Sequence, residues 1–533
     1  MSISDKSFLE RLNENPDYFE FWQDFHEFCK DIKINDKEYF VNSLPIIFKK
    51  IKNDGAGYAI YQGLRKLAVE KPSEAIQIIE LIEEKNNNEY LNFISSLLGG
   101  LSQSKSKYTY KDKILTLIRS EEEAKINSGV NAAYQVVISN KQEELKFINE
   151  VSQNIIQTVE KGNVDDLGII TRFYNKHLNS INDAKKIVVQ LLNTKKVEVQ
   201  SEVARSINTE FNFDEDPVHF KACLKLLTHT DSKYIGIYNT INFRLKDIIQ
   251  ERPELVTEFV NLWILNNKGN LKKITVLKEI IEDLYVSNPH TIESLFLEWL
   301  NSDNNTYKVA LQFVISDLNN YVDAVGLPKD KLEKLTETDA LYVVFMIVGY
   351  ILDRKYASEM LYNILEVHFN SERIRNHIAT LYAKYLIINY YSVTDILKEK
   401  RKKANPIITS IIDQIIEVSE RYYEQVTDLE VVNEFEPSDK RMTYFLKQQN
   451  KQMQELMDAT ENKRNSFLDF ATKISLKAGK SFFSKYDGKY TEESEMQNFR
   501  TSVEVPRIQY IDEIGQIKSR IMWQNMKRNE LPN

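Results

Sequence analysis

The sequence predicts an all-α protein, an α-solenoid in which helix–turn–helix units of about 36 residues stack along the chain. Helix breakers are scarce, with 15 glycines and 11 prolines among 533 residues. Prolines also recur at a fixed spacing, since Pro217, Pro253 and Pro289 lie 36 residues apart. Apolar residues on one helical face follow each proline, and a helix pair can bury such a face only by stacking on its neighbours.

The first segment, residues 1–70, is predicted to be an N-terminal helical cap, because the aromatic-rich stretch PDYFEFWQDFHEFCKDI precedes the first repeat. Helical repeats are expected over 71–330. Their first helices should begin at Pro72, near Asn140 and Asn182, and at the three later prolines, because proline is favoured at the first helical position.

Second helices are predicted at three junctions: LLNTKKVEVQSEVARSI from Leu191, LLTHTDSKYIGIYNTI from Leu226 and WLNSDNNTYKVALQFVI from Trp299. Each junction has an apolar helix end, a short polar turn and a further amphipathic helix. The turn with Asp231 or Asp303 resembles that of HEAT-type repeats, which implies a HEAT-like helical-repeat architecture over about 70–325. An irregular helical bundle is the alternative.

The following segment, residues 331–436, has longer and more hydrophobic helices that are expected to continue the solenoid. Its 13-residue apolar run from Ala340 to Leu352 is shorter than the roughly 20 residues of a membrane span, so a buried helix is predicted. The last segment, 437–533, is predicted to contain a long polar helix that ends near Gly479, followed by an irregular C-terminal docking tail.

The stretch Ala478-Gly479-Lys480-Ser481 is similar to the end of a phosphate-binding P-loop. A P-loop needs a second glycine five residues before the Gly-Lys pair, where its backbone N–H groups surround the phosphates. Ile474 occupies that position. We therefore interpret Gly479 as the end of a helix, with lysines in the last turn.

The tail has two apolar features that suit a docking element. Aromatic residues follow Gly479, and an isoleucine stripe marks a terminal amphipathic helix. The predicted partner-binding residues are Phe482, Phe483, Tyr486, Tyr490, Ile511, Ile514, Ile517 and Ile521. The tail could fold back on the body or insert into another protein, and folding back is favoured because an exposed stripe promotes aggregation.

Two further patterns are the basis of an alternative in which the chain contacts nucleic acid. RFYNKH, from Arg172 to His177, resembles the R-x4-H pattern of HEPN-type ribonucleases, which implies that the arginine and histidine act on RNA phosphate. KEKRKK is a basic cluster that could bind phosphate, although lysines are also favoured at a helix C-terminus. Its basic residues are Lys398, Lys400, Arg401, Lys402 and Lys403.

The cysteine content and the N-terminus indicate a cytoplasmic protein. Cys29 and Cys223 are the only cysteines, and no apolar signal-peptide segment begins the sequence. His26 with Cys29 and His219 with Cys223 have zinc-ligand types, but nearly 190 residues separate the two pairs. We expect no metal, no cofactor and no membrane association.

The absence of a convincing catalytic set predicts a non-enzymatic scaffold. It would bind one or more protein partners, not identified by the sequence, through the solenoid surface and the tail. The alternative is a nucleic-acid-binding or nucleic-acid-processing subunit of a bacterial defence or toxin system, including a HEPN-like ribonuclease. The net charge of −8 favours the scaffold, because nucleic acid is itself negatively charged.

Overall fold

The computed structural model divides into two compact units, Met1–Thr291 (unit 1) and Ile292–Asn533 (unit 2). The structure describes residues 25–30, 32, 34, 36–51, 57–85, 87–104, 110–137, 141–211, 213–318, 324–427, 440, 443–444, 447, 474–478, 481–486, 489–490, 494–495, 507–508 and 512–532. Throughout these ranges, no helix is long and apolar enough to span a membrane.

Unit 1 contains α-helices joined by short turns. The bounds are α3 (Lys37–Ile51), α4 (Tyr58–Glu70), α5 (Pro72–Glu84), η2 (Asn88–Tyr90), α6 (Leu91–Leu101), α7 (Tyr110–Ile118), α8 (Glu123–Gln135), α9 (Lys141–Glu160), α10 (Gly168–Lys176), α11 (Ala184–Leu192), α12 (Val197–Thr209), α13 (Pro217–Leu227), α14 (Ile235–Ile248), α15 (Pro253–Asn266), η3 (Leu271–Leu277) and α16 (Lys278–Ser287).

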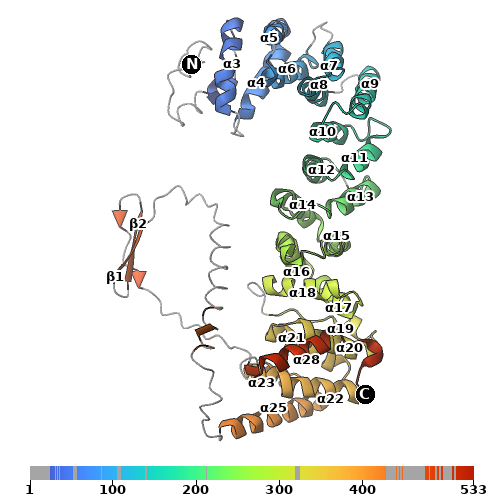
Figure 1. Cartoon of the computed structure of the whole chain (residues 1–533), viewed down its shortest axis with the longest axis vertical. Coiled ribbons are helices and arrows are strands. Elements are labelled where there is room, and N and C mark those ends of the chain that lie inside the picture. The colour runs from blue at the N-terminus through green and yellow to red at the C-terminus, as the bar shows by residue number, and fades with distance from the viewer. Residues whose placement is uncertain are drawn as a thin grey trace. The chain divides into compact units, whose positions relative to one another are not determined.

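Alternate helices of unit 1 pack side by side. The even-numbered helices from α4 to α16 contact one another in order, and α7 contacts α9 while α11, α13 and α15 form a second series. Figure 1 shows these two layers between α10 and α16. The apolar face of each helix is buried between the layers, as Leu255, Phe259 and Trp263 show in α15. This packing explains why helices with one polar face are stable here.

The predicted helix starts in the repeats are confirmed. Pro72, Pro217, Pro253 and Pro289 begin α5, α13, α15 and α17, and the three expected second helices are α12, α14 and α18. One first helix escaped detection: α7 begins at Tyr110 without a proline. The all-α prediction is confirmed for the packed bodies of both units, which are built of helices, whereas the HEAT-like repeat architecture stays a prediction.

Unit 2 is also helical. The bounds are α17 (Pro289–Asn301, which contains the boundary), α18 (Asn305–Leu318), α19 (Lys329–Leu332), α20 (Glu337–Tyr350), α21 (Arg354–Val367), α22 (Glu372–Leu381), η4 (Tyr382–Leu386, a π-helical turn), α23 (Ile387–Asn389), α24 (Val393–Arg401), α25 (Pro406–Thr427), α28 (Glu513–Gln524) and η7 (Arg528–Glu530).

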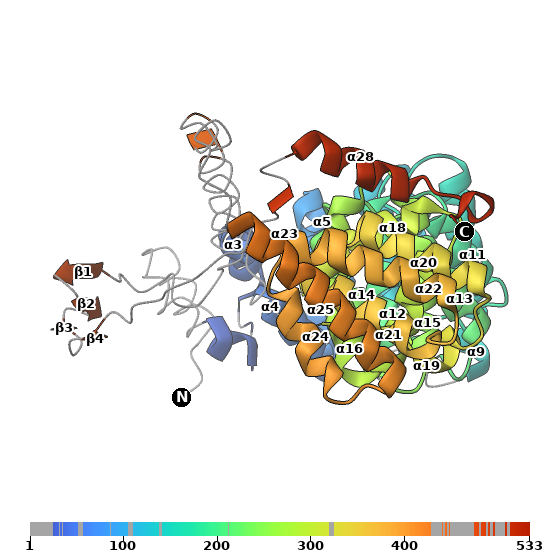
Figure 2. The same cartoon turned by 90° about the horizontal axis from the view of Figure 1, so that it is seen from below.

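The core of unit 2 surrounds α20. Every residue from Ala340 to Tyr350 is buried, which confirms the predicted buried helix. Helices α18, α21, α22 and α28 contact α20. Figure 2 shows α28, which is distant in sequence, lying along the outside of this helical group. The end of the chain therefore completes the surroundings of α20.

The predicted helix up to Gly479 is wrong in its last turn. Ile474–Ala478 forms β1, which pairs antiparallel with β2 (Ser481–Tyr486) so that Ala478 lies opposite Ser481. Strands β3 (Lys489–Tyr490) and β4 (Ser494–Glu495) also pair with β2. The residues of β1 alternate between apolar and polar, which is the period of a strand. In a P-loop a helix follows the loop, whereas here Ser481 begins a second strand.

Candidate partner-binding groove

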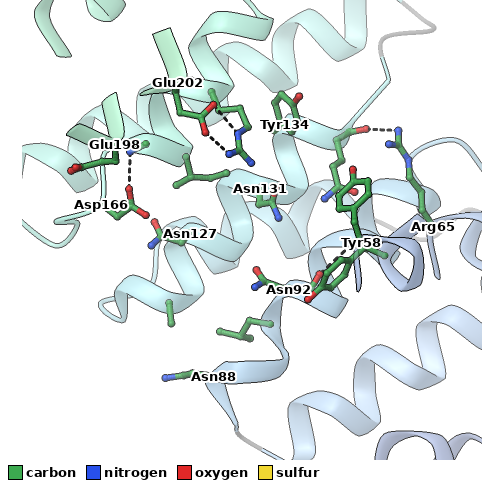
Figure 3. A pocket seen from close by; sticks show the side chains of 18 of the residues that line it. Tyr58, Arg65, Asn88, Asn92, Asn127, Asn131, Tyr134, Asp166, Glu198 and Glu202 are labelled. Atoms are coloured by element: carbon green, nitrogen blue, oxygen red, sulfur yellow. Dashed lines mark hydrogen bonds and ion pairs between the residues drawn. The ribbon is translucent and has the colours of Figure 1, made fainter. Parts of the chain in front are cut away.

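A groove crosses the even-numbered helices α4, α6, α8, α10 and α12 of unit 1, and we call it the amide groove. Its volume is about 740 Å³. Figure 3 shows labelled side chains of α4, α6, α8 and α12, with Asp166 just before α10, around the groove. Its polar lining includes the amides of Gln62, Asn88, Asn92, Asn127, Asn131 and Gln135 and the rings of Tyr58, Tyr61 and Tyr134.

Small residues bring the helices beneath the groove into close contact. A Cβ atom added to Gly100 of α6 would overlap the Arg65 carbonyl oxygen of α4 and lie 2.7 Å from the Ala68 Cβ atom. On the other side of α6, the hydroxyls of Ser95 and Ser128 are 2.9 Å apart, which links α6 to α8. Helices packed this closely are rigid supports for the longer side chains on their exposed faces.

Four asparagine side chains line the groove. Asn127 and Asn131 are four residues apart in α8 and lie on one face of that helix. Asn92 lies in α6, and Asn88 lies in η2 before it, where its Nδ2 group donates to Glu122 Oε2 at 3.4 Å. In the part of the chain that the structure describes, the Asn92 and Asn131 side chains have no protein hydrogen-bond partner, and the Asn127 Oδ1 atom is buried and unpaired. Leaving a buried acceptor unpaired costs about 1–3 kcal/mol.

An ion-pair cluster borders the groove at α10 and α12. Arg172 donates from Nε to Glu202 Oε2 at 3.1 Å and from Nη2 to Oε1, and Arg205 donates from Nε to Glu202 Oε2 at 3.1 Å. Burial acts to raise the pKa of Glu202, but the hydrogen bonds from the two arginines hold it below its ordinary value. Arg172 is therefore a neutralised part of the groove wall.

Two carboxylates beside this cluster lack such a partner. Asp166 accepts a hydrogen bond from the Gly168 backbone N–H at 2.8 Å, and Glu198 lies at the start of α12. Among the residues with described positions, neither carboxylate forms an ion pair. At this end the lining has three carboxylates, of Asp166, Glu198 and Glu202, and one guanidinium group, of Arg172, so it is acidic.

The opposite end, at α4, is aromatic and closed by an arginine. The rings of Tyr58 and Tyr61 have centroids 6.3 Å apart, and Tyr61 lies 5.3 Å from Phe93. Arg65 donates from Nη2 to the Gln135 carbonyl oxygen at 3.0 Å, which caps the end of α8. Its charge is thus used at a helix C-terminus, where cations are favoured.

The suggested nuclease pair is not brought together as an exposed site. Arg172 faces the groove and is bound to Glu202, whereas His177 follows the end of α10 and is 1% exposed. Burial, with a smaller contribution from the charge of Lys176, lowers the pKa of His177 to about 4. Its ring packs 4.9 Å from that of Phe173. A buried, neutral histidine is poorly placed to exchange protons with RNA in the groove.

The basic cluster at the end of α24 is largely paired. Lys398 lies near Glu420 at 3.5 Å, Lys400 near Glu359 at 2.6 Å, Arg401 near Asp413 at 2.6 Å and Lys402 near Glu399 at 2.6 Å. Lys403 is exposed, and no ion pair reaches it within the described ranges. Paired cations have less charge to offer a phosphate backbone, so the cluster is better explained as a helix end.

The terminal helix does fold back, but not through the isoleucine stripe. Trp523 is the buried residue of α28, with its ring 4.8 Å from that of Tyr385. Ile514, Ile517 and Ile521 are 67%, 49% and 51% exposed. The stripe therefore stays available to a partner.

The remaining predicted docking residues are only partly described. Phe482, Phe483 and Tyr486 lie on β2 and Tyr490 on β3, and only their backbones are described. Ile511 falls outside the described residues.

The cysteines are buried thiols. Burial raises the pKa of Cys29 and of Cys223 to about 12. In α13 the Cys223 Sγ atom lies 3.7 Å from His219 Nε2. Over the ranges given above, no group of three or more His, Cys, Asp or Glu side chains could hold a metal ion.

The amide groove itself was not predicted from the sequence. Its signal was present, since the pair Asn88 and Asn92 recurs 39 residues later as Asn127 and Asn131. Two amide pairs at one repeat interval indicate a shared exposed face. The comparison with known proteins adds no precedent, because no protein-family model matches the chain and no curated protein matches it.

Proposed function

We propose that this chain is a non-enzymatic scaffold that binds a partner protein, with the amide groove of unit 1 as its principal site and HEAT-like stacking of helix pairs as its architecture. The observation that carries the proposal is the groove lined by amides, of which those of Asn92 and Asn131 have no protein partner in the described structure. Amides both donate and accept hydrogen bonds, so they match the backbone of another protein. They supply neither a nucleophile nor a general base.

The exposed stripe on α28 supports a second contact with the partner. Ile514, Ile517 and Ile521, with Met522 at 55% exposure, form an apolar surface on a helix whose other face is fixed to unit 2. An apolar helix face of the partner would fit it, because burial removes apolar area from water. The C-terminal tail thus contributes to binding without being the only attachment.

The nucleic-acid alternative has less support. Four of the five cations in the cluster 398–403 are paired with carboxylates, and the amide groove has more acidic than basic groups. Binding to nucleic acid depends on cations that neutralise phosphates.

Affinity capture with the tagged full chain, from cells that naturally produce it, tests the proposal. Asn92→Arg adds a bulky charge to the groove, and Gln190→Arg makes the same kind of change at an exposed position of α11, outside the groove. We expect a protein that wild type and Gln190→Arg retain and that Asn92→Arg loses. Equal retention by all three proteins would contradict the groove as the site.

A salt titration with DNA and RNA tests the alternative. Tight binding that falls steeply with salt, and that weakens when Lys402 and Lys403 are changed to alanine, would overturn the scaffold proposal in favour of nucleic-acid binding. RNA cleavage that is lost in His177→Ala would do the same in favour of a nuclease.

A further inference from the structure

The dimensions of the amide groove limit the shape of its ligand. Axes of packed helices are about 9 Å apart, so four spacings from α4 to α12 make a groove roughly 35 Å long. An α-helix already pairs its own backbone N–H and C=O groups, whereas an extended chain leaves these groups free for the amides of the groove. About ten residues of extended chain would span the groove at roughly 3.3 Å per residue.

The amides are spaced to contact the backbone of such a chain. Residues four apart on a helix are separated by about 6 Å along its axis, so Asn127 and Asn131 lie towards opposite edges of a chain that crosses α8. An extended chain exposes N–H and C=O groups along both edges. Asn92 of α6 and Asn88 of η2 supply amides about three peptide residues away, and Asn88 also donates to Glu122 Oε2 at 3.4 Å. The side-chain amides of Asn92 and Asn131, which have no protein partner in the described structure, would pair with peptide N–H and C=O groups.

The charges of the groove indicate one side chain of the ligand. Asp166 and Glu198 line the end at α10 and α12, where Arg172 is already bound to Glu202. A lysine or arginine of the ligand would find two carboxylates there that form no ion pair in the described structure. A charge-assisted hydrogen bond to a half-buried carboxylate is stronger than one between neutral groups.

We propose that the amide groove binds an extended peptide segment of the partner protein, with a lysine or arginine at Asp166 and Glu198 and the peptide backbone between the asparagine pairs. This inference rests on the proposed function and specifies the ligand of the same site. Contacts to the peptide backbone supply affinity that does not depend on the peptide's sequence. The carboxylates of Asp166 and Glu198 determine where along the peptide the basic residue must lie.

Fluorescence anisotropy with the full chain and a position-scanning library of 12-residue peptides tests the inference. Each pool contains one fixed lysine, and matched pools contain norleucine in its place. We expect the lysine pools to bind more tightly at one position. Glu198→Gln should weaken binding of that lysine pool by about tenfold without affecting its norleucine counterpart, whereas Asn127→Ala should weaken both.

Two controls keep the result specific. Glu251→Gln, an exposed substitution outside the groove, should leave every affinity unchanged. Glu198→Lys should transfer the preference to pools with a fixed glutamate, which a merely unfolded variant cannot do.

The inference and the proposed function can fail separately. If no pool binds while a folded partner is captured by wild type and lost by Asn92→Arg, the scaffold proposal stands and the extended-peptide inference is wrong. If capture shows no groove-dependent partner, the proposed function fails whatever the peptides do. Binding of all pools that is insensitive to both Asn127→Ala and Glu198→Gln also overturns the inference.

Discussion

Replacing Arg528 should weaken the attachment of the C-terminal end of the chain to the rest of unit 2. The guanidinium donates from Nε to Asp339 at 2.8 Å and from Nη2 to the Asn301 side-chain oxygen at 2.8 Å, and it also contacts Asp303 and the Asn301 carbonyl oxygen. It lies 4.1 Å from the centroid of the Tyr342 ring. Arg528 thereby connects η7, α17, the turn before α18 and α20 through one side chain.

The size of the effect follows from how exposed each partner is. Asp303 is 89% exposed, so its contact contributes about 0.2–1 kcal/mol. Asp339 is 28% exposed, and its contact together with the Asn301 hydrogen bond contributes about 1–2 kcal/mol. The cation–π contact adds about 0.5–1 kcal/mol. Water and Thr336 can still satisfy Asp339 after the change, so we expect Arg528→Ala to lower the free energy of unfolding by about 2–3 kcal/mol.

Scanning calorimetry of the full chain measures this effect. For a unit of this size, each kcal/mol changes the Tm by about 2–4 °C, so the transition of unit 2 should fall by roughly 5–10 °C. Lys527→Ala is the matched control, because Lys527 is an exposed neighbour whose ion pair with Glu530 is 3.7 Å long. Equal Tm values for the two variants would refute the assignment of Arg528 as the anchor.

Three further outcomes are expected. Gly100→Ala should destabilise unit 1 by about 1–3 kcal/mol, because the added Cβ atom meets the α4 backbone. Gly236→Ala, which has open space around it, should be neutral or stabilising. Urea denaturation compares the two variants, and equal effects would contradict the close contact between α6 and α4. Burial lowers the pKa of Lys308 to about 8, so between pH 8 and about 10 the unfolded chain holds a proton that the folded chain has released. The stability of unit 2 should therefore rise with pH over that window. Lys308→Met should reduce this rise, as measured by urea titrations at several pH values. Because the pKa of His177 is lowered in the folded chain, the unfolded chain binds a proton first, and stability falls as the pH drops from about 6.5 towards 4. His177→Gln should lessen this fall in acid denaturation. An unchanged acid profile would show that His177 is not the buried neutral group.

The helices were predictable because their signals are local. Proline at the first helical position and a one-sided apolar pattern require no knowledge of the rest of the chain, and Pro217, Pro253 and Pro289 accordingly mark α13, α15 and α17. The strand at Ile474–Ala478 was missed for the opposite reason. Its five residues alternate between apolar and polar, but so short a run does not outweigh the helical pattern before it, and the antiparallel partner across Ala478 and Ser481 decides its conformation.

The groove depends on contacts that sequence spacing does not determine. The exposed face of α8 carries Asn127 and Asn131, but which residues lie opposite depends on how closely α6 and α8 approach. That distance is set by Ser95, Ser128 and Gly99, residues with no apolar pattern of their own. Sequence analysis instead singled out charged and cationic stretches, and most of those charges are paired in the folded chain.

The orientation of α28 shows why an apolar stripe alone is an incomplete guide to burial. The isoleucines gave the stronger pattern, yet Trp523 faces unit 2, and Gln524 donates from Nε2 to the Gly349 carbonyl oxygen at 2.8 Å. Any side chain larger than hydrogen at residue 349 would lie 3.2 Å from the Gln524 backbone nitrogen, so close approach of α28 depends on that glycine. Because α28 is ordered through this polar face, a partner that binds the stripe would not bear the entropic cost of folding the helix. In the even-numbered helices of the groove, as in α28, one face packs against the rest of the protein and the opposite face stays exposed. Both proposed contacts use such an exposed face of a helix that packing already holds in place.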